Sequence, residues 1–222
     1  MAHLYLFLLG LASGLTVLAI SAYRRVSPRW LTWTLIASGL FVISRYVTMA
    51  LFTSEDAPQR FWALRHCWYG TSIGLTLPSV FAVDQLVRHP AMTPKKLLIR
   101  FAPFLIAYLV VILFADMQAV PDLVVGWSVK LTVPWRMTMM LVQAAFVAGF
   151  TLVAVVLMMK LPSWPIRRAL AGLVAGYGYL TLDGLLQAAG WWYFRPNLYS
   201  EMVTLLALWY AFETASRLQQ TS

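Results

Sequence analysis

One of the two longest apolar runs of this chain is VPWRMTMMLVQAAFVAGFTLVAVVLMM, from Val133 to Met159, and Arg136 is its only charged residue. A helix of about 20 apolar residues crosses the ~30 Å hydrocarbon core of a bilayer. An apolar run of this length is typical of a transmembrane helix rather than of a core helix in a soluble domain. The run therefore predicts that this part of the chain lies in a membrane.

Further apolar runs occupy most of the remaining sequence and are separated by short polar connections. They cover His3–Ala22, Trp30–Phe52, Trp62–Val87, Leu97–Phe114, Ile166–Trp192 and Tyr199–Leu218. We expect an all-α polytopic membrane protein, built as a seven-transmembrane-helix bundle that forms one domain over residues 1–222.

The composition supports this class of protein and excludes others. Hydrophobic residues make up 61% of the chain and charged residues only 11%, whereas soluble domains average about 25% charged residues. The chain has a single cysteine, Cys67, which excludes an internal disulfide framework and a thiolate metal cluster.

The charges divide unequally between the two sides of the predicted bundle. Five basic residues balance five acidic ones on one side, whereas the other side has an excess of basic residues over Asp84 and Glu213. These basic residues are Arg24, Arg25, Arg29, Arg88, Lys95, Lys96, Arg100, Lys160, Arg167, Arg168 and Arg217. The positive-inside rule then places the N-terminus outside and the C-terminus in the cytoplasm. The net charge of +9 thus indicates orientation and contact with anionic lipid, not nucleic-acid binding.

Local signals predict three further features. The longest connection, from Ala115 to Thr132, contains an apolar stretch and is expected to form a short hairpin or interfacial lid, or else an ordered loop. Pro78 lies in the middle of the third run and predicts a kink there. Small residues at helical spacing suggest close helix packing at Gly10 with Gly14, Gly70 with Gly74, and Gly172 with Gly176.

Two opposite charges lie deep in predicted helices. Arg45 is about 22 Å along its helix from Trp30, and Asp183 is about 25 Å along its helix from Ile166, at 1.5 Å per residue. Both helices run outward, so the two side chains are expected to reach a similar depth. Because an isolated buried charge is costly, we expect them to interact directly or through water. The pair could either serve a function or only fix helix packing.

Other polar residues are expected around this pair, mostly in the outer half of the bundle. Tyr179, Asp183 and Gln187 recur on one face of their helix. The predicted ligand-binding residues are Arg45, Arg65, Tyr69, Arg136, Gln143, Tyr179, Asp183, Gln187 and Glu201. Guanidinium groups bind carboxylates through paired hydrogen bonds, so the site would suit an anionic or carboxylate-bearing ligand that enters from outside. Arg65 and Arg136 could instead extend to the lipid headgroups.

Several catalytic chemistries find no support in the sequence. Neither the H-E-x-x-H zinc motif nor the G-x-S-x-G nucleophile motif occurs, and no glycine-rich phosphate loop is evident. We therefore expect no enzyme activity, no metal and no cofactor.

Four segments carry a resemblance to a known family. They are Tyr23-Arg24-Arg25, the turn 54–60 before Phe61-Trp62, the run Gly74-Leu75-Thr76-Leu77-Pro78, and the basic loop 88–96 before Phe101-Ala102-Pro103. With this layout the chain resembles the N-terminal seven-helix sensor module of bacterial membrane histidine kinases. The resemblance implies a multi-pass protein of the inner (plasma) membrane that senses a ligand or the membrane state.

In that family the seventh helix continues into a cytoplasmic signalling helix. Here the sequence ends at Ser222 without a kinase part, so no catalytic residue carries over. We expect a stand-alone relative, a sensor read by a cytoplasmic or membrane partner, or a truncated chain. A small-solute transporter or channel, and a non-catalytic subunit of a larger membrane complex, are the competing interpretations.

Overall fold

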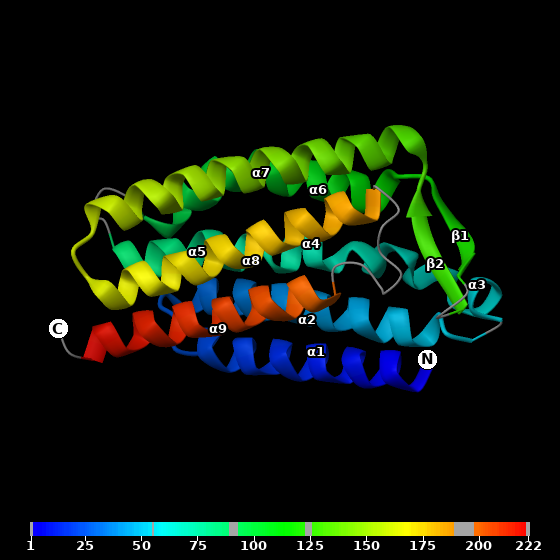
Figure 1. The fold of residues 1–222 in the computed structure, drawn as a ribbon, viewed down its shortest axis with the longest axis horizontal. Helices are drawn as coiled ribbons and strands as arrows, with labels where there is room; N and C mark the ends of the chain where they lie inside the picture. The colour runs from blue at the N-terminus through cyan, green and yellow to red at the C-terminus, as the bar shows by residue number, and fades with distance from the viewer. Residues whose placement is uncertain (1, 55, 89–92, 123–125, 189–197, 221–222) are drawn as a thin grey trace.

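The computed structural model describes residues 2–54, 56–88, 93–122, 126–188 and 198–220. Long helices lie side by side along one axis, and a β-hairpin stands across one end of the bundle (Figure 1). The elements in chain order are α1 (Ala2–Tyr23), α2 (Arg29–Leu51), α3 (Ala57–Arg60), the 3₁₀ helix η1 (Trp62–Tyr69), α4 (Gly70–Gly74), α5 (Thr76–Val87), α6 (Pro94–Phe114), β1 (Met117–Asp122), β2 (Gly126–Leu131), α7 (Val133–Lys160), α8 (Trp164–Ala188) and α9 (Leu198–Gln220).

Five helices are long and apolar enough to cross a membrane. They cover His3–Tyr23, Arg29–Leu51, Pro94–Phe114, Val133–Lys160 and Trp164–Leu186. Large apolar side chains on these helices are exposed, as a lipid-facing surface requires: Phe7 is 67% exposed, Ile99 72% and Leu152 67%. These helices identify the chain as a multi-pass membrane protein.

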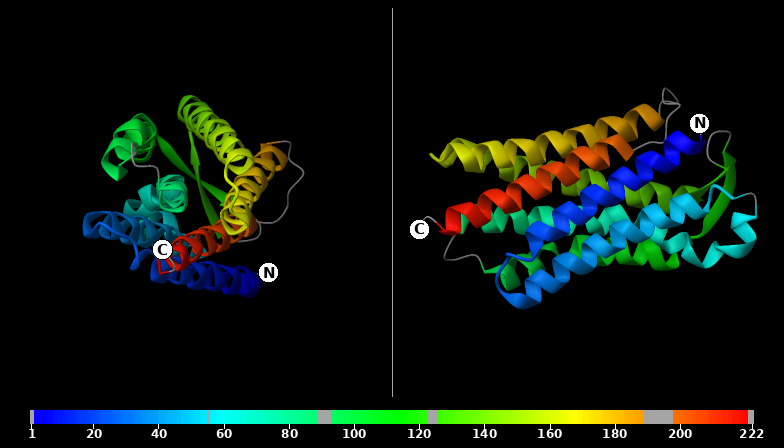
Figure 2. Two further views of the ribbon diagram at one scale, coloured as in Figure 1. Left: turned by 90° about the vertical axis from the view of Figure 1, so that its left-hand side faces the viewer. Right: turned by 90° about the horizontal axis from the view of Figure 1, so that it is seen from below.

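Helix α9 corresponds to the expected seventh run, but it is not among the five apolar candidates. It packs against α1, α5 and α8, and in Figure 2 it runs between α1 and α8. Most of its residues are buried, including Ser200, Glu201 and Thr204. Because the neighbouring helices shield it, α9 can carry polar residues that a lipid-facing helix could not.

The third expected run forms three helical segments instead of one continuous helix. It begins as the 3₁₀ helix η1, continues as α4, and restarts as α5 after Leu75. Pro78 has no N–H to bond the carbonyl of Gly74, and its ring clashes with that carbonyl. The interruption at Leu75 therefore agrees with the irregularity predicted from Pro78, whereas the 3₁₀ segment was not predicted.

Two of the three predicted glycine contacts are formed. A Cβ atom at Gly70 or Gly74 would collide with α2, at the Phe41 carbonyl and the Val42 side chain respectively, and one at Gly176 would lie 2.9 Å from Thr204 Oγ1 of α9. The expectation for Gly10 and Gly14 is wrong, because nothing lies within 4 Å of a Cβ atom at either position.

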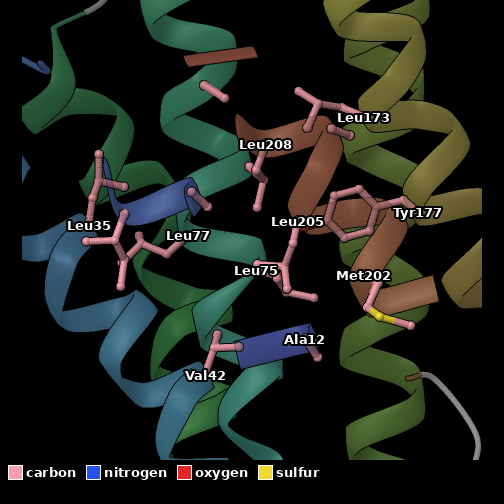
Figure 3. Close-up of a cluster of buried hydrophobic side chains, with 14 of the residues drawn as sticks. Ala12, Leu35, Val42, Leu75, Leu77, Leu173, Tyr177, Met202, Leu205 and Leu208 are labelled. Atoms are coloured by element: carbon pink, nitrogen blue, oxygen red, sulfur yellow. The ribbon is translucent and has the colours of Figure 1, made fainter. Parts of the chain in front are cut away.

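The core between the helices is built of aliphatic and aromatic side chains. Ala12 of α1, Leu35 of α2, Leu173 of α8 and Leu208 of α9 belong to it (Figure 3), and each is fully buried. Close packing between helices, rather than exclusion from water, stabilises such a core within a lipid environment.

The connection after α6 forms a hairpin, one of the alternatives that the sequence left open. Strands β1 and β2 pair antiparallel, with Met117 opposite Leu131 and Asp122 opposite Gly126. The backbone N–H of Trp127 donates to the Phe52 carbonyl at 3.0 Å, and the Tyr69 hydroxyl donates to the Val129 carbonyl at 3.1 Å. The hairpin is thus fixed to the end of α2 and to η1. We call this end of the molecule the hairpin end.

Candidate functional site

A buried ion pair joins α2 to α9. Arg45 Nη2 lies 2.9 Å from Glu201 Oε1, and the two residues are only 6% and 1% exposed. Arg45 Nη1 also donates to the backbone carbonyl of Trp68. The guanidinium group therefore connects α2, α9 and η1.

Two hydroxyl groups complete the coordination of the Glu201 carboxylate. The Tyr46 hydroxyl donates to Oε2 and the Thr71 hydroxyl donates to Oε1, each at 3.1 Å. Glu201 also lies in the first turn of α9, where the free N–H groups of the helix favour a negative charge. These contacts offset part of the cost of burying a carboxylate within the bundle. We call Arg45, Tyr46, Thr71, Glu201 and the Trp68 carbonyl the central cluster.

The irregular third run explains why the Trp68 carbonyl can accept a bond from Arg45. In a continuous α-helix this carbonyl would bond the N–H of Ser72. Here η1 ends at Tyr69 and α4 begins at Gly70, so the helical hydrogen-bond pattern changes beside this carbonyl. Non-helical backbone at membrane depth is tolerated where it is buried in protein, and Arg45 bonds the carbonyl at this junction.

The predicted direct pairing of Arg45 with Asp183 is wrong. Arg45 pairs with Glu201, whereas Asp183, 1% exposed, has an Oδ1 atom without a hydrogen-bond partner in the described structure. Counting residues along a helix gives the depth of a side chain in the membrane only if all helices end at the same level. Helix α2 continues about 9 Å past Arg45, whereas α9 begins only ~5 Å before Glu201. The two residues nevertheless meet, so these helices do not end at the same level.

Three other predicted site residues have different partners. Tyr69 bonds the hairpin through Val129 and is the sequence neighbour of Trp68. The Gln143 amide oxygen accepts a bond from the Tyr108 hydroxyl at 2.8 Å. Arg65 donates to the Trp62 carbonyl at 3.1 Å, and its guanidinium carbon lies 5.3 Å from the centroid of the Trp62 ring.

The remaining predicted residues lie apart from the central cluster or cannot be placed. Arg136 is exposed near the start of α7, as expected for a side chain that extends to the headgroups, and Tyr179 is half-buried on α8. The side chain of Gln187 lies outside the described residues. In the described part of the chain, Arg136 and Tyr179 form no hydrogen bond or ion pair with Arg45 or Glu201.

Sequence reasoning missed Tyr46, Thr71 and the Trp68 carbonyl. Tyr46 adjoins Arg45, and Thr71 adjoins Gly70, where close helix packing was predicted. Those two neighbours were the available signals. The Trp68 carbonyl had no signal, because a backbone group becomes available only where the helix geometry changes.

Two shallow, open hollows in the described part of the chain lie away from the central cluster. One, of about 520 Å³, is an apolar groove along α7 and is lined by Ala144, Val147, Ala148, Thr151, Leu152 and Val155 together with Thr181 of α8. The other, of about 500 Å³, lies beside the hairpin and is lined by Pro58, Trp62, Met117, Gln118 and Ala119. Neither includes Arg45 or Glu201, so neither is the outward-facing cavity expected around these residues.

In the central cluster, the acid Glu201 and the base Arg45 are already paired, and the hydroxyl groups of Tyr46 and Thr71 both donate to the acid. Among the described residues, no group of three His, Cys, Asp or Glu side chains could hold a metal ion. A scan of protein-family models and searches of curated proteins and of solved structures found no match to this chain.

Proposed function

We propose that this chain is a seven-span sensor of the bacterial inner membrane, which binds a small carboxylate-bearing ligand and signals to a cytoplasmic partner. The five apolar helices, the segmented run η1–α4–α5 and α9 are its seven spans. The N-terminus and the hairpin face outward and the C-terminus faces the cytoplasm. The resemblance to sensor modules of histidine kinases supports the same class.

The arrangement of the chain ends and charges supports this orientation. The N-terminus lies at the hairpin end and the C-terminus at the opposite end (Figure 1), as an odd number of crossings requires. The loop between α7 and α8 lies at the C-terminal end, and Lys160, Arg167 and Arg168 flank it. Basic residues are retained on the cytoplasmic side during insertion.

The position of Glu201 carries the proposal. This buried carboxylate bonds side chains from α2 and α4 near the hairpin end, yet it belongs to α9, which continues to Gln220 at the opposite end. Near that end, Glu213 of α9 pairs with Arg25 at 2.6 Å. Any change in the partners of Glu201 therefore acts on a helix that reaches the cytoplasmic side.

A carboxylate ligand would compete with Glu201 for Arg45. Glu201 uses one oxygen on the guanidinium group and gives the other to Tyr46, and Arg45 Nε has no hydrogen-bond partner in the described structure. A ligand that bonded both Nε and Nη2 would form the stronger paired arrangement. Displacement of Glu201 would release α9 from α2. Neither of the two hollows described above includes Arg45, and in this proposal the helices around Arg45 separate when the ligand binds.

A distance measurement on α9 tests the proposal. Spin labels at Gln220→Cys and Pro162→Cys, in a Cys67→Ser background and in nanodiscs, report the position of α9 relative to the α7–α8 loop. Small mono- and dicarboxylates should change this distance, and Glu201→Gln should produce a similar change without ligand. Arg45→Lys should abolish the response because lysine lacks the paired geometry, whereas Arg136→Lys should retain it. An unchanged distance with every carboxylate and with Glu201→Gln would refute the sensor mechanism.

The segmented third run favours a transporter as the second candidate. Transporters commonly place discontinuous helices at their substrate sites, where unwound backbone faces the solute, and here the η1–α4 junction lies in the central cluster. Solute flux into liposomes that contain only this chain would support transport. Ligand binding without flux would support the sensor.

A further inference from the structure

Three charged side chains are buried in the described part of the chain, and their formal charges do not cancel. Arg45 carries one positive charge, whereas Glu201 and Asp183 carry one negative charge each. Arg45 and Glu201 neutralise each other at 2.9 Å, but Asp183 Oδ1 has no hydrogen-bond partner among the described residues. The described interior of the bundle therefore holds no spare positive charge with which to receive another anion.

A carboxylate that displaced Glu201 from Arg45 would upset this balance. The ligand would then pair with the guanidinium group, and Glu201 would remain in the bundle without its cation. The other partners of Glu201 are the hydroxyl groups of Tyr46 and Thr71, which donate hydrogen bonds but carry no charge. Because an unpaired charge inside a membrane protein is strongly unfavourable, the site cannot accept a bare anion at no further cost.

The titratable side chains around the pair do not supply the missing charge. On α1, α2, η1, α8 and α9 itself, those near the level of the pair are the phenols of Tyr5, Tyr46, Tyr69, Tyr179 and Tyr199. Phenols are neutral between pH 6 and pH 8, and α4 carries no titratable residue. The groups that lie or bond elsewhere are the exposed His3 of α1, Arg65 and His66 of η1, which contact Trp62 and Ile112, and Asp84 in the last turn of α5.

We infer that the ligand is a monocarboxylate that binds together with one proton. This inference rests on the proposed function and concerns the same site. The proton comes from the water on the ligand's side and forms an O–H bond with the Glu201 carboxylate as this group leaves Arg45. The ligand carboxylate takes its place on the guanidinium group. The cluster then contains one cation and one anion, as it did before binding, and the neutral Glu201 can still accept a hydrogen bond.

The same charge balance selects the class of ligand. Every group that bonds Glu201 in the cluster is a donor: Arg45 Nη2 and the hydroxyl groups of Thr71 and Tyr46. These donors suit a carboxylate on a short chain, because the Glu201 side chain that they hold is itself one. A second carboxylate on the ligand would require a second proton. Dicarboxylates should therefore bind with a steeper dependence on pH than monocarboxylates.

Calorimetric titration of the full chain in nanodiscs tests the inference. Acetate, propionate and butyrate are the probes, at pH 6, 7 and 8. Free monocarboxylates are ionised in this range, and the complex holds one proton more than the separate partners. Binding should thus weaken about tenfold for each unit by which the pH rises, and about a hundredfold per unit for succinate. The heats in phosphate and in Tris buffer should differ by the ionisation heat of one proton per bound monocarboxylate.

Three variants locate the proton. Glu201→Gln leaves Arg45 with a neutral neighbour, so propionate should bind without a proton, with an affinity that is independent of pH and at least tenfold higher than that of the unmodified chain at pH 8. Glu213→Gln changes a carboxylate of the same helix outside the cluster and should retain the tenfold dependence. Asp183→Asn should retain it as well, because the proton binds to Glu201.

Several results would overturn the inference. Equal affinity for the monocarboxylates at pH 6 and pH 8, or equal heats in the two buffers, would do so while leaving the sensor proposal intact, and both comparisons use the unmodified chain. Equal pH dependence for succinate and propionate would exclude the selection of monocarboxylates. A dependence that persisted in Glu201→Gln but disappeared in Asp183→Asn would exclude Glu201 as the proton acceptor. Proton-coupled binding without a change in the α9 distance would refute only the sensor mechanism, whereas the absence of carboxylate binding at every pH would refute both.

Discussion

Arg45 and Glu201 form a buried pair whose members depend on each other. Both are nearly inaccessible, and each would be left as an unpaired charge if the other were removed. Breaking such a pair by removing one partner costs about 3–5 kcal/mol, whereas replacing both by apolar residues is often neutral.

Single replacement of either residue should therefore destabilise the protein more than joint replacement. We expect Arg45→Met and Glu201→Met each to lower the free energy of unfolding by about 3 kcal/mol or more. The double variant should lose less than the sum of the two changes. Unfolding by denaturant titration in detergent measures these values, with Arg136→Met as the exposed control. Additive effects would show that the two charges do not stabilise each other.

Tyr69 is the residue that ties the hairpin to the segmented run. Its hydroxyl donates to Val129, so Tyr69→Phe removes one hydrogen bond and little volume. We expect a loss of about 1 kcal/mol and faster amide hydrogen exchange in β2. Thr138→Val is the control, since Thr138 bonds the Pro134 carbonyl within its own helix. Unchanged exchange in β2 would show that other contacts hold the hairpin.

At the scale of elements, the helices differ in what they face. The apolar helices expose large side chains, whereas α9 carries polar groups among its neighbours. The contact between α2 and α4 depends on Gly70 and Gly74, because any side chain there would meet α2. Close backbone approach of this kind compensates for the lack of a hydrophobic driving force within lipid.

Substitution of these glycines should separate α4 from α2. Gly70→Ala places a methyl group against the Phe41 carbonyl, which is backbone and cannot rotate away. We expect a loss of about 1–3 kcal/mol, together with a weaker Arg45–Glu201 coupling in the double-replacement experiment. Gly14→Ala should be neutral or stabilising, because its position is open and alanine favours helix. Equal effects of the two substitutions would contradict the packing described.

At the scale of the whole molecule, the ion pairs of α9 span its length. Glu201 binds α2 near the hairpin end, and Glu213 binds Arg25 near the C-terminal end. The two termini lie at opposite ends of the bundle (Figure 1). The orientation of the chain in the membrane therefore decides which of these two ion pairs lies nearer the outside.

Accessibility to a membrane-impermeant thiol reagent tests that sidedness. Gln118→Cys in β1 should react from outside intact cells, whereas Pro162→Cys between α7 and α8 should react only after the membrane is opened. Both variants carry Cys67→Ser, and the Cys67→Ser chain alone should not react. Reaction of both sites from the same side would exclude seven crossings in the proposed order.

Sequence alone determined the features that depend on chain length, hydropathy and local backbone preference. The five apolar spans, the hairpin after α6, the interruption before Pro78 and the close approaches at Gly70 and Gly176 follow from such local signals. Each depends on nearby residues and on the bilayer, so no knowledge of distant contacts was needed.

Only the tertiary structure decided which buried charges meet. Arg45 reaches Glu201 and the Trp68 carbonyl because α9 begins deep in the bundle and the third run changes helix type beside α2. Sequence patterns give the depth of a residue along its own helix, but the level at which helices start and the way they rotate depend on packing over the whole bundle. Asp183, at a similar distance along its own helix and also buried, therefore does not pair with Arg45.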